Sequence, residues 1–402
     1  MKEPTTGGDA ADGSLGELNP IVFRRRLMRW YRDNARALPW RNTSDPYGIW
    51  VSEIMLQQTR VAAVTEYYTE FMGRFPTLVS LALAPEADVL AAWSGLGYYR
   101  RARMLHKAAQ FIMTERHGLL PASALELRTL PGIGEYTAAA IASIAFGESV
   151  AVVDGNVERV ILRLTGRAND ATAATRRFVR DKAQTLVPPA HLQGSRTDSQ
   201  TGDEPGPPLT GNAAGDHNQA IMELGATVCL PRAPFCSQCP VIALCCTRGE
   251  HPTPARAPQR SLPVACLLDL RKRGTATEVL LERRPDAAAV MPSMYELPPL
   301  PLDTVEGLEP ALRLRHAITN TNYYVQVFSP RRLVRTNSGS HVSSGKRNGA
   351  AASALRSAIP TAPHALRWVR TTRLASLPLT GLTRKILQRL KIMKSNRIVL
   401  PE

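Results

Sequence analysis

The sequence predicts a multidomain protein, in which an all-α domain is followed by a smaller α+β domain. From residue 20 to residue 250, apolar side chains recur at helical spacing. A proline-rich segment, HPTPARAPQRSLP, separates this region from one in which residues 264–270, 278–282 and 323–328 read as strands. A chain of 402 residues is long enough for two domains that each bury their own core.

The composition marks off the ends of these domains. Residues 1–19 lack the basic-then-apolar order of a secretory signal and read as a disordered tail, and no apolar run approaches the roughly 20 residues of a membrane span. We therefore expect a cytoplasmic protein with no membrane partner. The first domain should cover residues 20–250, the linker residues 251–262 and the second domain residues 263–398. Two stretches rich in small and polar residues predict flexible segments within the domains: residues 188–216 and 336–363.

The positive charge is concentrated in the C-terminal part. Residues 310–402 contain seventeen Lys and Arg and one acidic residue, Glu402, which gives +16. The whole chain also has a net charge of +16, so residues 1–309 sum to zero. A basic region of this kind predicts a polyanionic partner, because each neutralised phosphate releases counterions.

The first helices carry one acidic residue in apolar company. Asn19 and Pro20 read as the N-cap and first residue of a helix. In the following helical segment Glu53 lies among apolar side chains such as Trp50 and Ile54. Burial disfavours the charged form of a carboxyl group, so we expect Glu53 to hold a proton near neutral pH.

Three more helical stretches lead to the middle of the domain. Residues 81–93 read as one amphipathic helix and residues 102–127 as two helices with a turn between them. Between these stretches lies a glycine turn that ends in Tyr98, Tyr99, Arg100 and Arg101. Aromatic and guanidinium groups together suit base stacking and phosphate contact.

The central stretch of the first domain is LPGIGEYTAAAIASIAFGESVAVVDGNVERV, which begins at Leu130. Gly132 and Gly134 allow a tight turn that brings backbone N–H groups to the surface, and the helix beginning near Tyr136 adds the positive end of its dipole. This combination suits a phosphate group. A single carboxylate, Asp154, follows twenty residues after the second glycine.

Four cysteines lie within seventeen residues and are spaced C-x6-C-x2-C-x5-C: Cys229, Cys236, Cys239 and Cys245. A cytosol keeps thiols reduced, so this cluster indicates a metal site rather than disulfides. Four thiolates suit either zinc or an iron-sulfur cluster. Cys246 is adjacent to the last cysteine and could replace it as a ligand, whereas Cys266 reads as a buried core thiol.

The hairpin L-P-G-I-G-x-x-T-A-x-x-I, the aspartate and the cysteine loop together resemble the helix-hairpin-helix DNA glycosylases of the endonuclease III superfamily. The resemblance implies the all-α glycosylase fold of that superfamily and one [4Fe-4S] cluster, whose loop has the same cysteine spacing. Superfamily members that also nick DNA place a lysine just after the hairpin glycines, where this chain has Tyr136. A tyrosine cannot form an imine, so we expect a monofunctional enzyme without a lyase step.

Three motifs resemble the MutY-type A/G-specific adenine glycosylases: W-V-S-E-I-M-L-Q-Q-T, Leu-Pro-Trp-Arg and Gly-Leu-Gly-Tyr-Tyr. These enzymes flip an adenine out of duplex DNA, opposite 8-oxoguanine or guanine, and hydrolyse its N-glycosidic bond. The resemblance implies that Glu53 protonates adenine and that Asp154 stabilises the oxocarbenium ion, with Tyr136 and Asn156 as hydrogen-bond partners. It also implies that Gln58 and Tyr98 are wedges that enter the duplex at the lesion. The side chains that would line the adenine pocket are Trp40, Arg41, Leu56 and Gln219.

The second domain resembles the Nudix-like domain with which that family reads 8-oxoguanine. No R-E-x-x-E-E helix for magnesium is present in the sequence, so we expect binding rather than hydrolysis. Residues 379–393 read as a basic amphipathic helix. The lesion-reading loop departs from the family, which carries Phe-Ser-His after Arg-His: this chain has Arg315-His316-Ala317-Ile318-Thr319-Asn320. Thr319 keeps a hydroxyl group and Asn320 keeps hydrogen-bonding capacity.

Two other functions remain open. An endonuclease III-like glycosylase/lyase for oxidised pyrimidines is disfavoured by Tyr136 and by the second domain. A non-catalytic iron-sulfur DNA-binding protein is disfavoured because binding alone would need neither Glu53 nor Asp154. We expect a monomer whose partner is double-stranded DNA containing A:8-oxoG or A:G mispairs.

Overall fold

The computed structural model describes residues 18–190, 211–251, 259–288, 290–318, 320–330, 353–360 and 365–393. Most of the expected tail, insertion, linker and flexible loop lies outside these residues. The chain forms two compact units, one from Met1–Glu53 and Leu119–Pro254 and the other from Ile54–Gly118 and Ala255–Glu402. None of the helices that the structure describes is long and apolar enough to cross a membrane.

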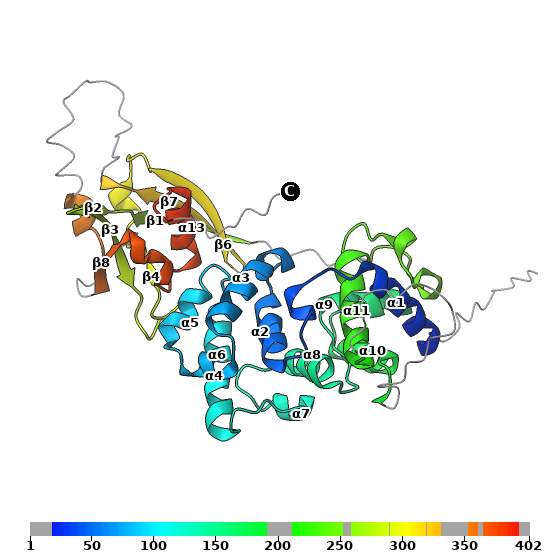
Figure 1. The fold of residues 1–402 in the computed structure, drawn as a ribbon. Helices are drawn as coiled ribbons and strands as arrows, with labels where there is room; N and C mark the ends of the chain where they lie inside the picture. The colour runs from blue at the N-terminus through cyan, green and yellow to red at the C-terminus, as the bar shows by residue number, and fades with distance from the viewer. Residues whose placement is uncertain are drawn as a thin grey trace, which may run out of the picture. The chain divides into compact units, whose positions relative to one another are not determined.

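The first unit is helical (Figure 1). Its helices are α1 (Pro20–Asn34), most of α2 (Pro46–Leu56), α7 (Ala124–Leu127), α8 (Glu135–Phe146), α9 (Gly155–Thr165), α10 (Ala173–Leu186) and α11 (Ala213–Thr227). The predicted start of α1 is confirmed, because the Asn19 side chain accepts the N–H groups of Ile21 and Val22 and Pro20 is the first helical residue. Helices α8 and α9 each end at a glycine in the left-handed conformation, Gly147 and Gly166.

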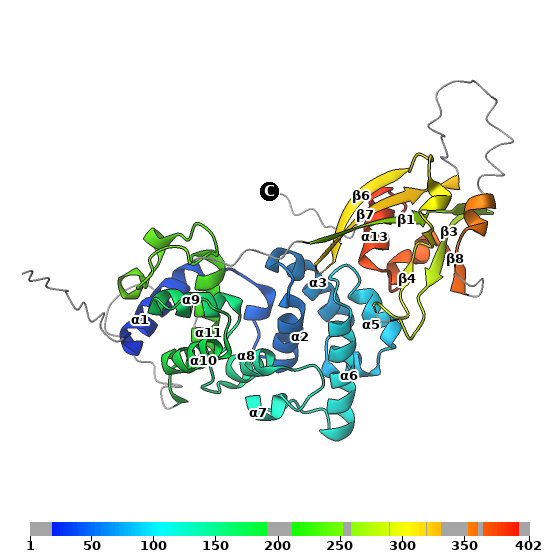
Figure 2. The ribbon, with the colours of Figure 1, turned by 180° about the vertical axis from the view of Figure 1, so that it is seen from behind.

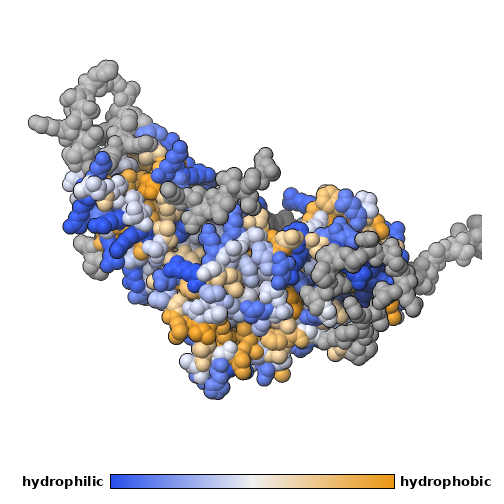
Figure 3. Space-filling view, viewed as in Figure 1, coloured by the Kyte–Doolittle hydropathy of each residue, from blue (hydrophilic) through white to orange (hydrophobic). Residues whose placement is uncertain are grey.

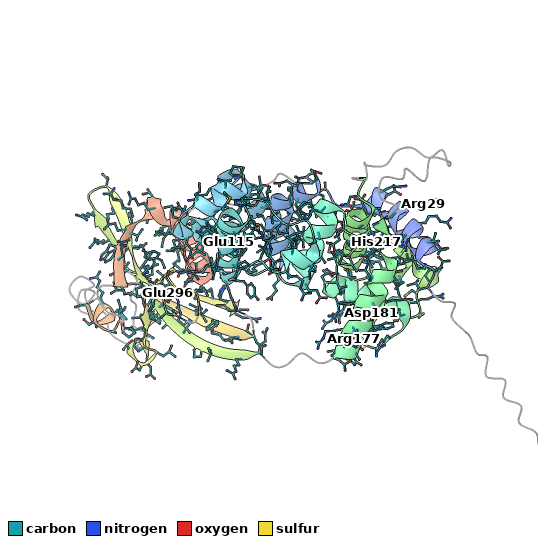
Figure 4. The ribbon with its side chains drawn as sticks, turned by 90° about the horizontal axis from the view of Figure 1, so that it is seen from below. Arg29, Glu115, Arg177, Asp181, His217 and Glu296 are labelled. Atoms are coloured by element: carbon teal, nitrogen blue, oxygen red, sulfur yellow. The ribbon has the colours of Figure 1, made fainter. Side chains whose placement is uncertain are left out.

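Helix α11 lies in the centre of this unit. It packs against α1, α8 and α9, and most of its residues are buried. The helix begins at Ala213, capped by the Asn212 side chain, so the prediction that the insertion extends to residue 216 is wrong for its last four residues. Figure 4 shows His217 among the helices of this unit. Burial lowers the pKa of His217 to about 3, so its ring is neutral at physiological pH.

The helical part of the second unit contains α3 (Val61–Arg74), α4 (Leu78–Leu83), α5 (Glu86–Ala92) and α6 (Arg100–Glu115), which are seen from both sides in Figures 1 and 2. The predicted single helix over residues 81–93 is wrong, since α4 ends before Pro85 and α5 begins after it. Proline lacks the N–H group that a continuous helix needs at this position. Val79 and Leu83 of α4 are exposed, and Figure 3 shows apolar side chains at the surface over this region.

The C-terminal part of the second unit is α+β, as the sequence predicts. Its strands are β1 (Arg260–Leu267), β2 (Leu270–Arg273), β3 (Ala276–Arg283), β4 (Tyr295–Glu296), β5 (Pro299–Leu300), β6 (Leu312–Ile318), β7 (Thr321–Phe328) and β8 (Leu366–Arg370). They form two sheets, one in the order β5-β1-β7-β6 with β1 and β7 parallel, and one in which β3 pairs with β2, β4 and β8. Helix α13 (Gly381–Arg389), within the predicted residues 379–393, packs its buried Ile386 and Leu387 on the apolar core of the sheets.

Two sequence predictions in this part are corrected. Residues 315–318 are not a loop but the end of β6, paired with β7 so that Ile318 opposes Thr321. Within the expected flexible loop, residues 353–357 are helical and Leu355 is buried against Leu267 and Phe328. The apolar/polar alternation of residues 312–315 does not continue through His316 and Ala317, and residues 353–357 are too short to show a helical repeat, so tertiary contacts determine both structures.

Candidate active site

Glu53 is a buried carboxyl group in the middle of α2. Only 4% of the residue is exposed, and its helix neighbours Trp50, Val51, Ile54 and Met55 are buried as well. The pKa of Glu53 is raised to about 7, chiefly by burial and also by nearby Asp154, although a hydrogen bond from Tyr136 and the charge of Arg41 act to lower it. A pKa of about 7 is in line with the expectation that Glu53 carries a proton near neutral pH.

Tyr136, in the first turn of α8, is the hydrogen-bond partner of Glu53. Its hydroxyl donates to Glu53 Oε2 at 2.6 Å and lies 3.7 Å from Met222 Sδ. Burial and the neighbouring carboxyl groups of Glu53 and Asp154 raise the pKa of Tyr136 well above its ordinary value. The phenol therefore stays protonated and donates a hydrogen bond to Glu53 across the pH range in which Glu53 titrates.

Asp154 caps the N-terminus of α9. Its Oδ1 accepts the backbone N–H groups of Asn156 and Val157 at 2.9 and 2.8 Å, and its Oδ2 accepts Asn156 Nδ2 at 2.7 Å. Three donors and the positive end of the helix dipole stabilise a carboxylate at this position. The first unit thus contains a carboxyl group held in an apolar setting, Glu53, and one held by donors, Asp154.

Arg159 connects Asn156 to the cysteine loop. Its Nη2 donates to Asn156 Oδ1 at 2.9 Å and to the Gly225 carbonyl at 2.6 Å, and its Nε donates to the Cys229 carbonyl at 2.7 Å. A side chain on Gly225 would not fit, because its Cβ would lie 2.7 Å from that of Asn156. The backbones of α9 and α11 therefore meet where Asn156 orients Asp154.

An ion cluster around a buried carboxylate lies on the α11 side of the site. Glu223, on α11, accepts Arg36 Nε at 2.6 Å and Arg41 Nη2 at 2.7 Å, and its own side chain is fully buried. Burial raises the pKa of Glu223, but the two arginines outweigh that effect and the net shift is downward. Trp40 and Gln219, predicted with Arg41 to line a base pocket, are both buried.

The glycine hairpin is exposed at the start of α8. Gly132 has a φ of +77°, which only glycine adopts without strain, and Gly134 is the N-cap of α8. A cavity of about 610 Å3 lies between α7, α8 and α10 and is lined by Tyr136, Val153, Arg128 and Arg180, among others. Neither Glu53 nor Asp154 lines that cavity.

All four cysteines of the predicted set line one small cavity, of about 30 Å3, together with Arg163 and Arg248. Cys246 does not line it and is exposed, which favours Cys245 over Cys246 as the fourth ligand. Burial raises the pKa of Cys239 to about 11, and the other three cysteines add to the shift. Among the described residues, no three His, Cys, Asp or Glu side chains lie close enough together to form a site for a metal ion.

The remaining predicted residues, including Leu56 at the end of α2, belong to the second unit. Gln58 and Tyr98 are both exposed and both have a positive φ, of 55° and 48°. Asn320 is exposed in the turn between β6 and β7, where its carbonyl accepts the Arg260 N–H group. Thr319 lies outside the described residues.

Sequence reasoning missed three charged residues that the structure brings to the site. Glu223 lies in a regular helical segment with no motif around it, and Arg36 precedes the Leu-Pro-Trp-Arg motif, so neither residue drew attention in the sequence. Arg159 follows Asn156 by three residues, which places both side chains on one face of α9. The spacing of Asn156 and Arg159 can be read from the sequence. The carbonyl groups on α11 and in the cysteine loop that accept hydrogen bonds from Arg159 cannot.

The family match lies in the helical part of the chain. Residues 51–189 match the model of the HhH-GPD superfamily of base excision DNA repair proteins. This match agrees with the helix-hairpin-helix glycosylase fold expected for the N-terminal part, which an α+β region follows.

Curated relatives carry one common name. The adenine DNA glycosylase of Rattus norvegicus is 45% identical over 234 residues, which cover 56% of this chain and 41% of the relative. The adenine DNA glycosylase of Mycobacterium tuberculosis is 38% identical over 255 residues, 63% of this chain and 77% of the relative. The chain thus spans less than half the length of the rat protein. The solved structure of a thermostable thymine-DNA glycosylase is 28% identical and covers 57% of this chain and 96% of that chain, with a TM-score of 0.48.

Proposed function

Because this chain belongs to the adenine DNA glycosylase family of the HhH-GPD base excision repair superfamily, we propose that it hydrolyses the N-glycosidic bond of adenine mispaired with 8-oxoguanine or guanine. The observation that carries the proposal is the buried Glu53, which holds a proton near neutral pH and accepts a hydrogen bond from Tyr136. An acid of this kind suits a reaction whose leaving group, adenine, departs poorly as an anion.

Glu53 is the general acid of the proposed mechanism. Protonation of adenine at N7 lets the base leave as a neutral molecule, and the pKa of about 7 balances the availability of the proton against the readiness to give it up. Tyr136 orients the carboxyl group and stabilises the carboxylate that remains after transfer, because its hydroxyl donates to Glu53 Oε2.

Asp154 acts on the sugar. When the glycosidic bond breaks, positive charge develops on the deoxyribose ring, and a fixed carboxylate stabilises it or traps it covalently before water attacks. The amide of Asn156 and two backbone N–H groups hold Asp154 in place. The two carboxyl groups are therefore suited to different roles by their environments, Glu53 in an apolar setting and Asp154 held by hydrogen-bond donors.

The base must leave the helical stack before it can meet these groups. Flipping costs a few kcal/mol, which a protein offsets with wedge and pocket contacts. We propose Gln58 and Tyr98 as the wedges and Trp40, Arg41, Leu56 and Gln219 as the lining of the adenine pocket, with Glu223 holding Arg41 there. The exposed hairpin at Gly132 and Gly134 is the proposed seat of a backbone phosphate of the duplex.

The α+β part is proposed to be a Nudix-like domain that reads the 8-oxoguanine side of the mispair. Its two sheets, one mixed and one antiparallel, and the helix α13 support this reading, and Asn320 lies at an exposed turn. Thr319, which precedes Asn320 in the sequence, is its proposed partner in reading the lesion. The strongly basic C-terminal sequence suits a duplex as the partner, with the protein acting as a monomer.

The cysteine loop is proposed to hold one [4Fe-4S] cluster. Cys229, Cys236, Cys239 and Cys245 provide the thiolate donors that such clusters prefer, and all four face one cavity. Arg163 donates to Cys229 Sγ at 3.3 Å, so its positive charge would stabilise a thiolate at Cys229. A bound cluster would cross-link this loop and fix its shape, and no catalytic step passes through it.

A single-turnover assay on three duplexes tests the proposal. They contain A:8-oxoG, A:G and thymine glycol, and each reaction is analysed with and without alkaline treatment. We expect release of adenine from the first two, with strand breaks only after alkali. Release of thymine glycol with breaks before alkali would favour the glycosylase/lyase alternative, and no release from any duplex would favour the non-catalytic one.

A further inference from the structure

Arg101, near the start of α6, makes an unusual number of contacts with the protein backbone. Its Nη1 donates to the carbonyls of Ile54, Met55 and Gln57 at 2.7, 3.0 and 2.5 Å. Its Nη2 donates to Thr59 Oγ1 at 3.2 Å and to the carbonyls of Gly97 and Leu96 at 3.3 and 3.4 Å. One guanidinium group thus joins the C-terminal end of α2 to the turn that follows α5.

Each of these two segments carries one exposed side chain on a strained backbone. Gln58 lies between Gln57 and Thr59, which both bond to Arg101, and has a φ of 55°. Tyr98 directly follows Gly97 and has a φ of 48°. A residue other than glycine in this region costs of order 1 kcal/mol and persists only where surrounding contacts hold it.

The position of Arg101 suits that task electrostatically. The last carbonyls of α2 carry the negative end of the helix dipole and have no partners further along the helix. The guanidinium also lies 5.4 Å from the centre of the Tyr98 ring and 5.5 Å from that of Trp93, whose Nε1 donates to the Gly97 carbonyl. Burial lowers the pKa of Arg101 only to about 10, so the side chain is still a cation at neutral pH.

We propose that Arg101 is a positioning residue that holds Gln58 and Tyr98 in the one backbone arrangement from which both can enter a DNA duplex. This inference rests on the proposed function, in which these two side chains are the wedges. Arg101 itself touches neither the base nor the sugar. Its loss should therefore impair extrusion of the base and leave the chemistry of Glu53 and Asp154 intact.

Lysine is the informative replacement, because it keeps the charge but offers one nitrogen where Arg101 offers two to separate turns. The test uses a duplex with 2-aminopurine next to the target adenine, whose fluorescence rises when the adenine leaves the stack. Glu53→Gln is the background in which the base stays attached. We expect Glu53→Gln to give a rise on binding, and Arg101→Lys in that background to lose about half of the rise or more, with duplex affinity within about threefold.

The control is Lys107→Gln, an exposed position on the same helix, which should leave the fluorescence rise unchanged. In the catalytically intact protein Arg101→Lys should slow adenine release about tenfold. Thr59→Val removes a single Nη2 acceptor and should give a smaller loss in the same direction, so the test holds even if Arg101 variants fold poorly.

The outcomes separate this inference from the proposed function. No fluorescence rise with Glu53→Gln alone would contradict base extrusion by the protein, and with it the proposed function. A rise with Glu53→Gln that Arg101→Lys and Thr59→Val leave unchanged would overturn the positioning role of Arg101 while the proposed function stands.

Discussion

Replacement of Glu53 by glutamine should stabilise the fold at alkaline pH while it abolishes adenine release. Glutamine has nearly the same shape and can still accept the Tyr136 hydroxyl, but it carries no charge. Burial raises the pKa of Glu53 from 4.5 to about 7. A carboxyl group whose pKa is raised in the folded state destabilises that state increasingly as pH rises from the lower value to the higher one.

The size of this effect follows from the shift. The difference between 7 and 4.5 is 2.5 pH units, and at about 1.36 kcal/mol per unit it corresponds to about 3 kcal/mol. The residue is 4% exposed, so solvent screening reduces this value little. Below pH 4.5 the carboxyl group is protonated in both states and the difference between the two proteins should vanish.

Urea unfolding of both proteins at pH 5 and pH 8 measures the prediction. We expect Glu53→Gln to be more stable by about 2–3 kcal/mol at pH 8 and by much less at pH 5. Glu70→Gln, at an exposed position on α3, is the matched control and should leave both curves in place. Equal stability of Glu53→Gln and the parent at pH 8 would show that Glu53 is not held in an environment that disfavours its charge.

Other variants test the neighbouring contacts. Tyr136→Phe removes a hydrogen bond that lowers the pKa of Glu53, so the alkaline limb of the single-turnover pH profile should move up by about one pH unit; an unmoved limb would separate Tyr136 from Glu53. Arg159→Gln disrupts four side-chain hydrogen bonds at once and should lower the free energy of unfolding by about 2 kcal/mol and slow adenine release; parent-like stability and rate would contradict the link from Asn156 to the cysteine loop. Cys245→Ser should lose iron, measured by metal analysis of the purified protein, whereas Cys246→Ser should keep it; the reverse result would assign Cys246 as the ligand.

The sequence predicted the parts of the site that lie close together along the chain. Asn19 and Pro20 mark the start of α1, because the capping bonds and the proline act within the first turn. Glu53 can be recognised as buried because its helix neighbours are apolar. The contact between Glu53 and Tyr136 joins residues 83 positions apart, so periodicity alone could not show it. The same holds for the bond from Arg36 to Glu223, which are separated by 187 positions.

The strands were the least predictable elements. β6 carries Arg313, Arg315 and Ala317 on its exposed side, opposite the buried Leu314 and half-buried residues that include the polar His316. The apolar/polar alternation therefore fails after residue 315, and the strand becomes clear only from its pairing with β7. Pro85, by contrast, is a helix-breaking residue that can be read directly from the sequence. The prediction missed the break because the apolar residues on both sides of Pro85 continue at helical spacing. Local residues such as prolines and capping side chains therefore determine where helices begin and end. Pairing with distant strands determines the structure of segments whose own sequence pattern is weak.

The pH dependence of single-turnover adenine release from an A:8-oxoG duplex tests the central claim most directly. If protonated Glu53 delivers the proton, the rate should be high at acidic pH and fall as pH rises through about 7, and Glu53→Gln should release no adenine at any pH. A rate that stays constant from pH 6 to pH 9, or a Glu53→Gln protein that retains the parent rate, would contradict that role.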